Sequence, residues 1–163
     1  MGKIQIVFFD VHGTILNPKT NEISVKTKES LKALHNEGIK LCAITRGDYI
    51  NIPNLEELDF DAYITGNGMF CYAKDILIYE QDKKNETNKN NAVSKILEYF
   101  HLNKDESLAF GIGDNDIELF SSAVGYIVAM GDATSRFKTI SNEICGTIAD
   151  EGIYKFLLNH LII

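Results

Sequence analysis

The sequence predicts an α/β fold, a three-layer sandwich with a mostly parallel, Rossmann-like sheet and a small β-hairpin. Three observations lead to this prediction. The chain has 163 residues, which is the usual size of one domain. Hydrophobic residues make up 45% of it and charged residues 24%, as in chains that fold around a core. Short apolar runs alternate with amphipathic stretches, an order that is typical of parallel sheets with helices on both faces.

The first elements are a strand and a helix. Residues 3–9 (KIQIVFF) form an apolar run rich in β-branched residues, ended by Asp10 and Gly13, which indicates a buried strand. After a polar loop, residues 25–38 place leucines among charged residues and end in glycine, as amphipathic helices do.

The later elements continue the same alternation. Residues 69–81 contain two β-rich runs around Lys74-Asp75, which predicts the hairpin. Residues 82–91 are polar throughout. The further strands are expected at 39–44, 61–65, 107–112, 125–130 and 146–150, and the further helices at 92–102, 115–123, 132–141 and 151–161.

Charge and cysteine content argue against several classes of protein. The net charge of −7 argues against nucleic acid as a partner, because phosphate backbones require clustered Lys and Arg. The three cysteines, Cys42, Cys71 and Cys145, follow no CxxC spacing and are interpreted as residues of a reducing compartment. We expect no leader, since Lys3 precedes only a short apolar run, and no membrane span, since no apolar stretch approaches about 20 residues. We therefore expect a cytoplasmic protein with no membrane partner.

Polar side chains gather at the carboxyl ends of the predicted strands, where open parallel sheets bind ligands. A carboxylate nucleophile, hydroxyl and ammonium groups for phosphate, and acids for a magnesium ion together favour phosphoryl transfer. The set consists of Asp10, His12, Thr14, Thr45, Arg46, Thr65, Asn67, Lys89, Asp114, Asn115 and Asp116.

These residues lie in motifs that resemble those of the haloacid dehalogenase-like (HAD) superfamily, close to the Cof-type phosphatases. The resemblance covers nearly the whole chain, and five motifs in order make it specific. They are FFDVHGTIL (the nucleophile motif), LCAITRG, ITGNG (a glycine-rich turn), NKNNAVSKIL and FGIGDNDIELF, followed by the tail patterns VAMGDA and TIADEGIYKFL.

The resemblance implies a magnesium-dependent phosphatase that hydrolyses a phosphomonoester through an aspartyl phosphate on Asp10. It assigns the catalytic work to Asp10, His12, Thr45 and Lys89, of which Thr45 and Lys89 would hold the phosphoryl oxygens. Expected substrate-binding residues are Gly13, Thr14, Arg46, Asn67 and Asn115. Expected metal ligands are Asp10, the backbone carbonyl of His12, Asp114 and Asp116.

His12 departs from the family pattern, which has an aspartate there to protonate the leaving oxygen and then activate water. Histidine titrates near neutrality and can in principle do both. Its ring is bulkier, however, and its protonated form would sit close to the metal. We expect His12 to impair turnover rather than to replace the aspartate efficiently.

The fourth motif departs as well. The family pattern is Gly-Asp, two residues, then Asn-Asp, and an ungapped alignment on Asn115-Asp116 puts Ile112 at the first aspartate. Isoleucine cannot ligate magnesium, which requires oxygen. A shifted register instead offers Asp114 as the substitute ligand. Asp114 or Asn115 is equally well suited to cap the following helix.

Residues 69–88 are too few for the large cap domain that Cof-type chains insert at this point. We therefore expect one core domain, residues 1–163, with a short hairpin and loop instead of a cap. Such a site is open to a phosphorylated small molecule or to a phosphoryl group on a larger substrate, unless a second subunit of a homo-oligomer covers it. The alternative to an enzyme is a HAD-fold binding or regulatory protein that has lost most turnover through His12 and Ile112.

Overall fold

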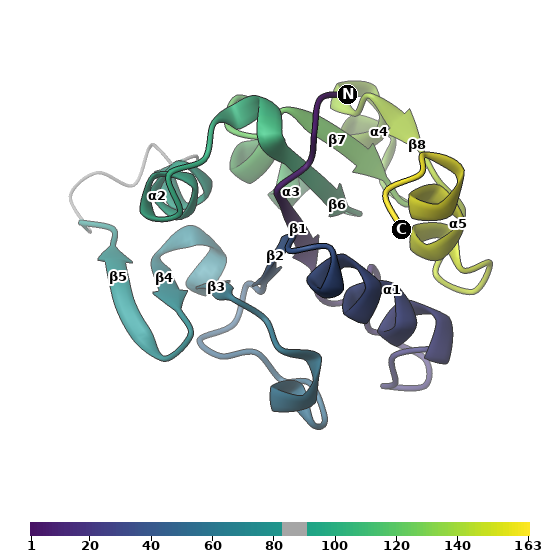
Figure 1. Cartoon of the computed structure of the whole chain (residues 1–163), viewed down its shortest axis with the longest axis horizontal. Coiled ribbons are helices and arrows are strands. Elements are labelled where there is room, and N and C mark those ends of the chain that lie inside the picture. The colour runs from purple at the N-terminus through teal and green to yellow at the C-terminus, as the bar shows by residue number, and fades with distance from the viewer. Residues whose placement is uncertain (83–90) are drawn as a thin grey trace.

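The computed structural model describes residues 1–82 and 91–163 and confirms the mostly parallel α/β fold. Within these residues one sheet has the strand order β5-β4-β3-β2-β1-β6-β7-β8 (Figure 1). The central strand β1 (Ile6–Asp10) pairs in parallel with β2 (Lys40–Ile44) on one side and β6 (Ser107–Gly111) on the other. The run that begins the sequence therefore becomes the middle of the sheet.

The outer strands differ on the two sides. On one side β7 (Tyr126–Ala129) and β8 (Glu143–Ile144) continue the parallel order. On the other side β3 (Ala62–Thr65) pairs in parallel with β2. The next strand, β4 (Phe70–Ala73), pairs antiparallel with β3, and β5 (Ile76–Glu80) pairs antiparallel with β4. The hairpin predicted in residues 69–81 is thus confirmed, and it extends the same sheet.

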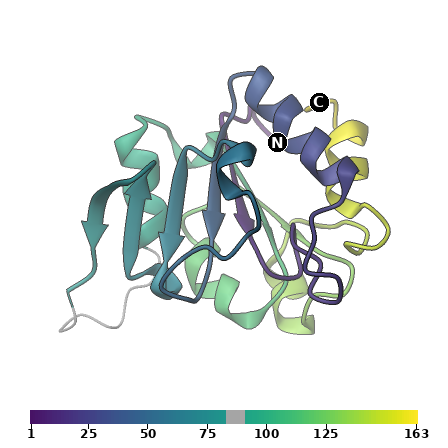
Figure 2. The same cartoon turned by 90° about the horizontal axis from the view of Figure 1, so that it is seen from below.

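Helices cover both faces of the sheet, which gives the three predicted layers (Figures 1 and 2). One face packs against α1 (Val25–Asn36) and α5 (Gly152–Asn159). The other packs against α2 (Asn91–Tyr99), α3 (Asp114–Phe120) and α4 (Ser135–Ile140). Short 3₁₀ turns lie at Leu55–Leu58 (η1), Gly66–Gly68 (η2) and Lys104–Glu106 (η3). None of the helices in the described ranges is long and apolar enough to span a bilayer.

The two cores follow from the alternation of side chains along β1. Phe9 faces α1 and α5, where its ring stacks on Phe110 with centroids 5.6 Å apart, and Phe110 meets Phe156 edge to face. Phe8 faces the opposite layer and packs in the same cluster as Phe120. Both faces of the central strand are therefore fully buried, as expected for a parallel sheet.

The prediction of a strand at residues 146–150 is wrong. The last strand, β8, lies earlier, and the chain then turns back on itself, because Asp150 and Gly152 donate their N–H groups to the carbonyl of Thr147 at 3.2 and 3.0 Å. Those groups are consequently not available to a neighbouring strand. The apolar, β-branched composition of the segment did not indicate this turn.

Strand register aligns the chain segments that carry the predicted site. Asp10 is level with Ile44 at the end of β2, Ile44 is level with Ile64 near the end of β3, and Phe9 is level with Phe110 near the end of β6. The residues that follow these strands are therefore neighbours at one edge of the sheet.

Candidate active site

A tight loop after β1 presents Asp10 and His12 at this edge. Gly13 has a positive φ of 84°, a conformation that favours glycine, and its N–H donates to the carbonyl of Leu16 at 2.9 Å. A Cβ on Gly13 would also lie 2.9 Å from Cδ1 of Ile112. The positive φ is the reason for glycine here, because the terminal methyl group of Ile112 can shift to make room for a Cβ. The N–H of Gly13 bonds within the loop to Leu16.

The carboxyl groups of Asp10 and Asp116 are neighbours and interact electrostatically. Burial raises the pKa of Asp10 well above its ordinary value, and the charge and hydrogen bond of Asp116 raise it further. Burial also raises the pKa of Asp116, although the backbone N–H groups that it accepts lower it in part. Two adjacent buried acids repel each other when both are ionised, so this pair holds a proton or attracts a cation.

Asp116 is fixed by the start of α3. It is 4% exposed, and its Oδ2 accepts from the N–H groups of Ile112 at 2.9 Å and Gly113 at 3.3 Å. The prediction that Asp114 or Asn115 caps this helix is therefore wrong. The capping residue is Gly113, and the Asp116 side chain reaches back to accept from the N–H groups of Gly113 and of Ile112 just before the helix.

Asp114 points away toward α4. Its Oδ1 accepts from the hydroxyl of Thr134 at 2.6 Å, and its Oδ2 lies 3.6 Å from Nη1 of Arg136. Within residues 1–82 and 91–163, no group of three or more His, Cys, Asp or Glu side chains is arranged to hold a metal ion. Of the predicted carboxylate ligands, the structure brings together Asp10 and Asp116.

The turns after β2 and β3 are tied to each other. Thr45 is 5% exposed, and its Oγ1 accepts from the N–H of Gly47 at 3.3 Å. Gly66 donates to the carbonyl of Gly47 at 2.7 Å, and Asn67 donates to that of Thr45 at 3.3 Å. These bonds hold the Thr45 hydroxyl in place beside the end of β1.

A cleft of about 450 Å³ opens at this edge. Asp10, His12, Thr45 and Arg46 line it, and all four were predicted site residues. The loop after Thr45 forms the rest of the wall, and its members were not predicted. Their position after a parallel strand was the signal that could have found them. They are Gly47, Asp48, Tyr49 (71% exposed) and Asn51.

Arg46 and Asn115 meet across the site. With the Asn115 amide turned so that its oxygen faces Arg46, this oxygen contacts all three guanidinium nitrogens, Nε at 2.5 Å, Nη1 at 2.7 Å and Nη2 at 3.1 Å. The positive charge of Arg46 also lowers the pKa of Asp10 and Asp116, which partly opposes the effect of burial. The sequence identified both residues but not their contact.

Other predicted residues lie outside the lining of this cleft. The hydroxyls of Thr14 and Thr65 and the Oδ1 of Asn67 are buried, and they have no hydrogen-bond partner in the described residues. Lys89 lies outside the described residues.

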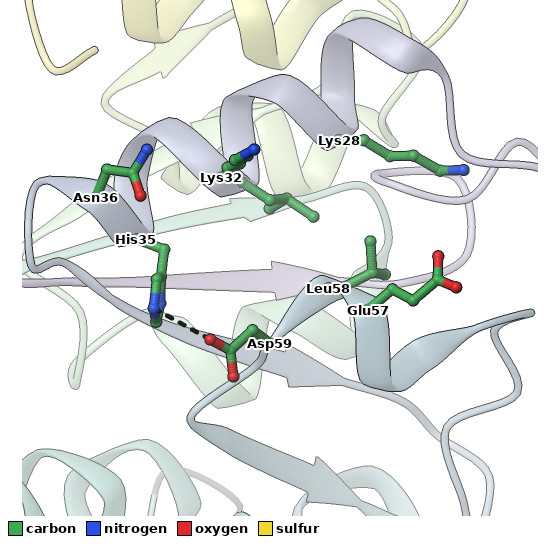
Figure 3. A pocket seen from close by; sticks show the side chains of 8 residues that line it. Lys28, Lys32, His35, Asn36, Glu57, Leu58 and Asp59 are labelled. Atoms are coloured by element: carbon green, nitrogen blue, oxygen red, sulfur yellow. Dashed lines mark ion pairs between the residues drawn. The ribbon is translucent and has the colours of Figure 1, made fainter.

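A second cleft, of about 380 Å³, lies between α1 and η1 (Figure 3). His35 and Asp59 form an ion pair of 3.1 Å at one end of it, and Lys28 and Glu57 lie at the other. None of the predicted catalytic, substrate-binding or metal-binding residues lines it. The candidate active site is therefore the cleft at the strand ends.

The profile of the haloacid dehalogenase-like hydrolases matches residues 7–87 and 83–157. The chain belongs to this family. The resemblance inferred from the motifs is thus confirmed. Among curated HAD-family phosphatases, the chain is 35% identical over 74 residues to the 5-amino-6-(5-phospho-D-ribitylamino)uracil phosphatase YitU of Bacillus subtilis, a match over 45% of this chain and 27% of the relative.

A phosphoglycolate phosphatase of Saccharolobus solfataricus is 34% identical over 73 residues, which is 45% of this chain and 32% of that protein. The chain thus spans about a third or less of these two relatives. Among solved structures, a HAD phosphatase from Bacteroides thetaiotaomicron superimposes with a TM-score of 0.88 at 18% identity, over 99% of this chain and 96% of that one. A HAD subclass IIB sugar phosphatase gives 0.86 at 21% identity, over 98% and 100% of the two chains. These structures establish the HAD fold.

Proposed function

We propose that the protein is a phosphomonoester hydrolase in which Asp10 is the nucleophile. The observation that carries the proposal is the position of Asp10, at the carboxyl end of the central strand in a cleft shared with Thr45 and Arg46. A carboxylate attacks phosphorus productively only where donors hold the phosphoryl oxygens, and a hydroxyl and a guanidinium are present here. The phosphatase relatives support the same class of reaction.

The reaction would proceed in two displacements. A carboxylate oxygen of Asp10 forms a bond to phosphorus while the bond to the leaving oxygen breaks, and protonated His12 gives that oxygen its proton. Water then attacks the aspartyl phosphate, neutral His12 takes the proton of the water, and inorganic phosphate and free Asp10 result. Because the His12 side chain is exposed in the cleft, its ring is held less firmly than a buried general acid, and we expect slow turnover.

The site residues fit a magnesium ion held by two carboxylates. Asp10 and Asp116 form an acid pair that is stabilised when a cation is near, and the backbone carbonyl of His12 would complete the protein ligands. Asp114 is engaged by Thr134 and Arg136. Magnesium commonly binds one or two carboxylates together with water and phosphate oxygens. When bound, the ion would neutralise charge on the phosphoryl group, and with so few protein ligands we expect weak affinity.

The proposed substrate class is a phosphomonoester, either a small molecule or a phosphoryl group on a larger one. Between β3 and α2 the described residues contain one hairpin, β4–β5, so we propose a single core domain without a cap. A core of this kind leaves the cleft accessible to leaving groups of different sizes. The substrates named for the relatives belong to much longer chains.

Hydrolysis of p-nitrophenyl phosphate, with and without magnesium, tests the proposal. We expect slow hydrolysis by the unaltered protein, faster hydrolysis by His12→Asp, and none by Asp10→Asn. No activity in either the unaltered protein or His12→Asp would refute the hydrolase. Equal activity in Asp10→Asn would refute the assigned nucleophile.

A second candidate is a phosphate-binding or regulatory protein with little turnover. Ile112 favours it, because this apolar side chain packs against the loop that carries Asp10. This candidate predicts that inorganic phosphate binds while neither the unaltered protein nor His12→Asp turns over substrate.

A further inference from the structure

Two isoleucines anchor the loop after β2 and thereby place Tyr49 and Asn51 at the wall of the active-site cleft. Ile52 is buried in the core beneath α1 and α5, and Ile50 packs against the same core. Tyr49, just before Ile50, and Asn51, between the two isoleucines, line the cleft instead. Moving either isoleucine outward would return apolar surface to water. The loop is therefore held with Tyr49 on the cleft side.

The same loop is also fixed where it leaves β2. The hydroxyl of Thr45 accepts from the N–H of Gly47 at 3.3 Å, and the carbonyl of Gly47 accepts from the N–H of Gly66 at 2.7 Å. Tyr49 follows this braced turn after one further residue. Its backbone is thus secured on both sides, by hydrogen bonds before it and by buried isoleucines after it.

The ring of Tyr49 is not used inside the protein. Its side chain is 71% exposed, the highest value for any tyrosine or phenylalanine in the described ranges. Within residues 1–82 and 91–163 the ring has no aromatic partner and the hydroxyl has no hydrogen bond. Tyrosine offers a large, rigid contact area with few torsions to fix, so a ligand can bind against it at a low cost in conformational entropy. The ring is available to whatever occupies the cleft.

The other lining residues determine which part of a ligand this ring would meet. Asp10, Thr45 and Arg46 line the part of the cleft where the phosphoryl group is proposed to lie. Tyr49 is further along the loop and lines the same cleft, so it is placed for the group that the phosphoryl group leaves behind. Aromatic rings pair with other rings in offset-stacked or edge-to-face arrangements, which a short alkyl chain cannot reproduce.

We propose that Tyr49 forms the leaving-group subsite of this cleft and that the leaving group carries an aromatic or heteroaromatic ring close to its ester oxygen. The inference rests on the proposed hydrolysis of a phosphomonoester at Asp10, and it narrows the substrate class from phosphomonoesters in general to those of planar rings. Tyr49 contacts the leaving group and takes no part in making or breaking bonds. It determines which substrates bind.

Titration calorimetry of the full chain with two phosphonates tests this subsite. Benzylphosphonate carries a ring and ethylphosphonate does not, and neither is consumed, because a phosphorus–carbon bond replaces the ester bond. We expect the unaltered protein to bind benzylphosphonate about threefold to tenfold more tightly than ethylphosphonate, as a ring–ring contact would give. Tyr49→Phe should keep this preference, and Tyr49→Ala should reduce it to less than about twofold.

Tyr99→Ala is the matched control. Tyr99, on α2, is the next most exposed tyrosine or phenylalanine at 47%, and it does not line this cleft. We expect this variant to keep the preference of the unaltered protein. Circular dichroism confirms that each variant is folded. The proposal is overturned if the unaltered protein binds the two phosphonates equally or binds neither, or if Tyr49→Ala retains the preference.

Steady-state kinetics separate this subsite from the hydrolase. With p-nitrophenyl phosphate, Tyr49→Ala should raise KM by about threefold to tenfold and change kcat by less than about twofold, because the ring binds substrate and transition state alike. A preference for benzylphosphonate that depends on Tyr49, in a protein that has no turnover even as His12→Asp, supports the subsite and refutes the hydrolase. Turnover with a KM that Tyr49→Ala leaves unchanged refutes the subsite alone.

Discussion

The two sides of the first turn of α3 form separate polar networks. On the inner side, Asn115 meets Arg46 while Asp116 meets Asp10 and two backbone N–H groups. On the outer side, Asp114 meets Thr134 and Arg136. Each helical residue advances about 100° around the axis, so Asp114 and Asp116 point to opposite sides although one residue separates them. Proximity in sequence does not make these two acids equivalent, and substitutions at matched positions should show it.

The largest expected difference concerns turnover. Asp10→Asn removes the nucleophile on the inner side and should lower kcat for p-nitrophenyl phosphate by about a thousandfold or more. Asp114→Asn, on the outer side, should change kcat by less than about threefold, because its partners lie outside the cleft. Steady-state kinetics of both variants measure the contrast. A comparable loss in Asp114→Asn would place Asp114 in the catalytic machinery.

The second-largest expected difference is in the free energy of unfolding of variants at Asp116 and Asp114. Asp116→Ala leaves two N–H groups at the start of α3 without their acceptor, and we expect a loss of about 1–3 kcal/mol in the free energy of unfolding. Urea denaturation in acidic buffer is the suitable measurement, because the pKa values of both acids are raised and a lower pH limits the repulsion between Asp116 and Asp10. Asp114→Ala, which removes exposed contacts, should cost about 0.5 kcal/mol or less. Equal losses would contradict the capping role of Asp116.

Magnesium affinity should also respond differently to substitutions on the two sides of α3. Ile112→Asp adds a third carboxylate beside the loop of Asp10, and we expect magnesium to bind about tenfold more tightly, since ligand charge sets affinity for hard cations. The increase in melting temperature on adding magnesium measures this without turnover. Asp114→Asn should leave the magnesium-induced increase unchanged. If Asp114→Asn abolishes it, the outer acid is a ligand.

The smallest expected effect is a pH dependence of stability. The pKa of Asp10 is raised in the folded protein, so the native state holds a proton that the unfolded chain releases above about pH 4. The stability that Asp10 contributes is therefore fully present below that pH and is lost as pH rises through the raised pKa. Asp10→Asn removes the loss and should be about 1 kcal/mol more stable than the unaltered protein at pH 8, with no gain at pH 4. Asp114→Asn serves as the control, and a gain that does not grow with pH would contradict the raised pKa.

The sequence predicted the fold well because local signals and burial agree. The apolar runs at β1, β2 and β6 are buried on both faces, so their composition alone marks them. β8 was misplaced because it has two residues, Glu143 and Ile144, and depends on pairing with β7 for its conformation. A strand so short leaves little pattern in the sequence.

The candidate site was predicted as a set of residues and not as a set of contacts. The position of Asp10, His12 and Thr45 at strand ends follows from the motifs and the parallel topology. Which acid faces Asp10 depends on where α3 begins, and the alternatives at Asp114 and Asp116 differ by half a helical turn. The contact of Arg46 with Asn115 joins segments far apart in sequence, and no local pattern specifies it.

The central place of β1 also has a consequence for the order of folding. Asp10, Arg46 and Asn115 belong to segments that become neighbours only when β2 and β6 have both paired with β1. The β1–β2 unit can form early through its nearer contacts, whereas the pairing with β6 closes a much longer loop. Phosphate should therefore slow unfolding without accelerating the first steps of folding, because its binding site exists only in the completed sheet.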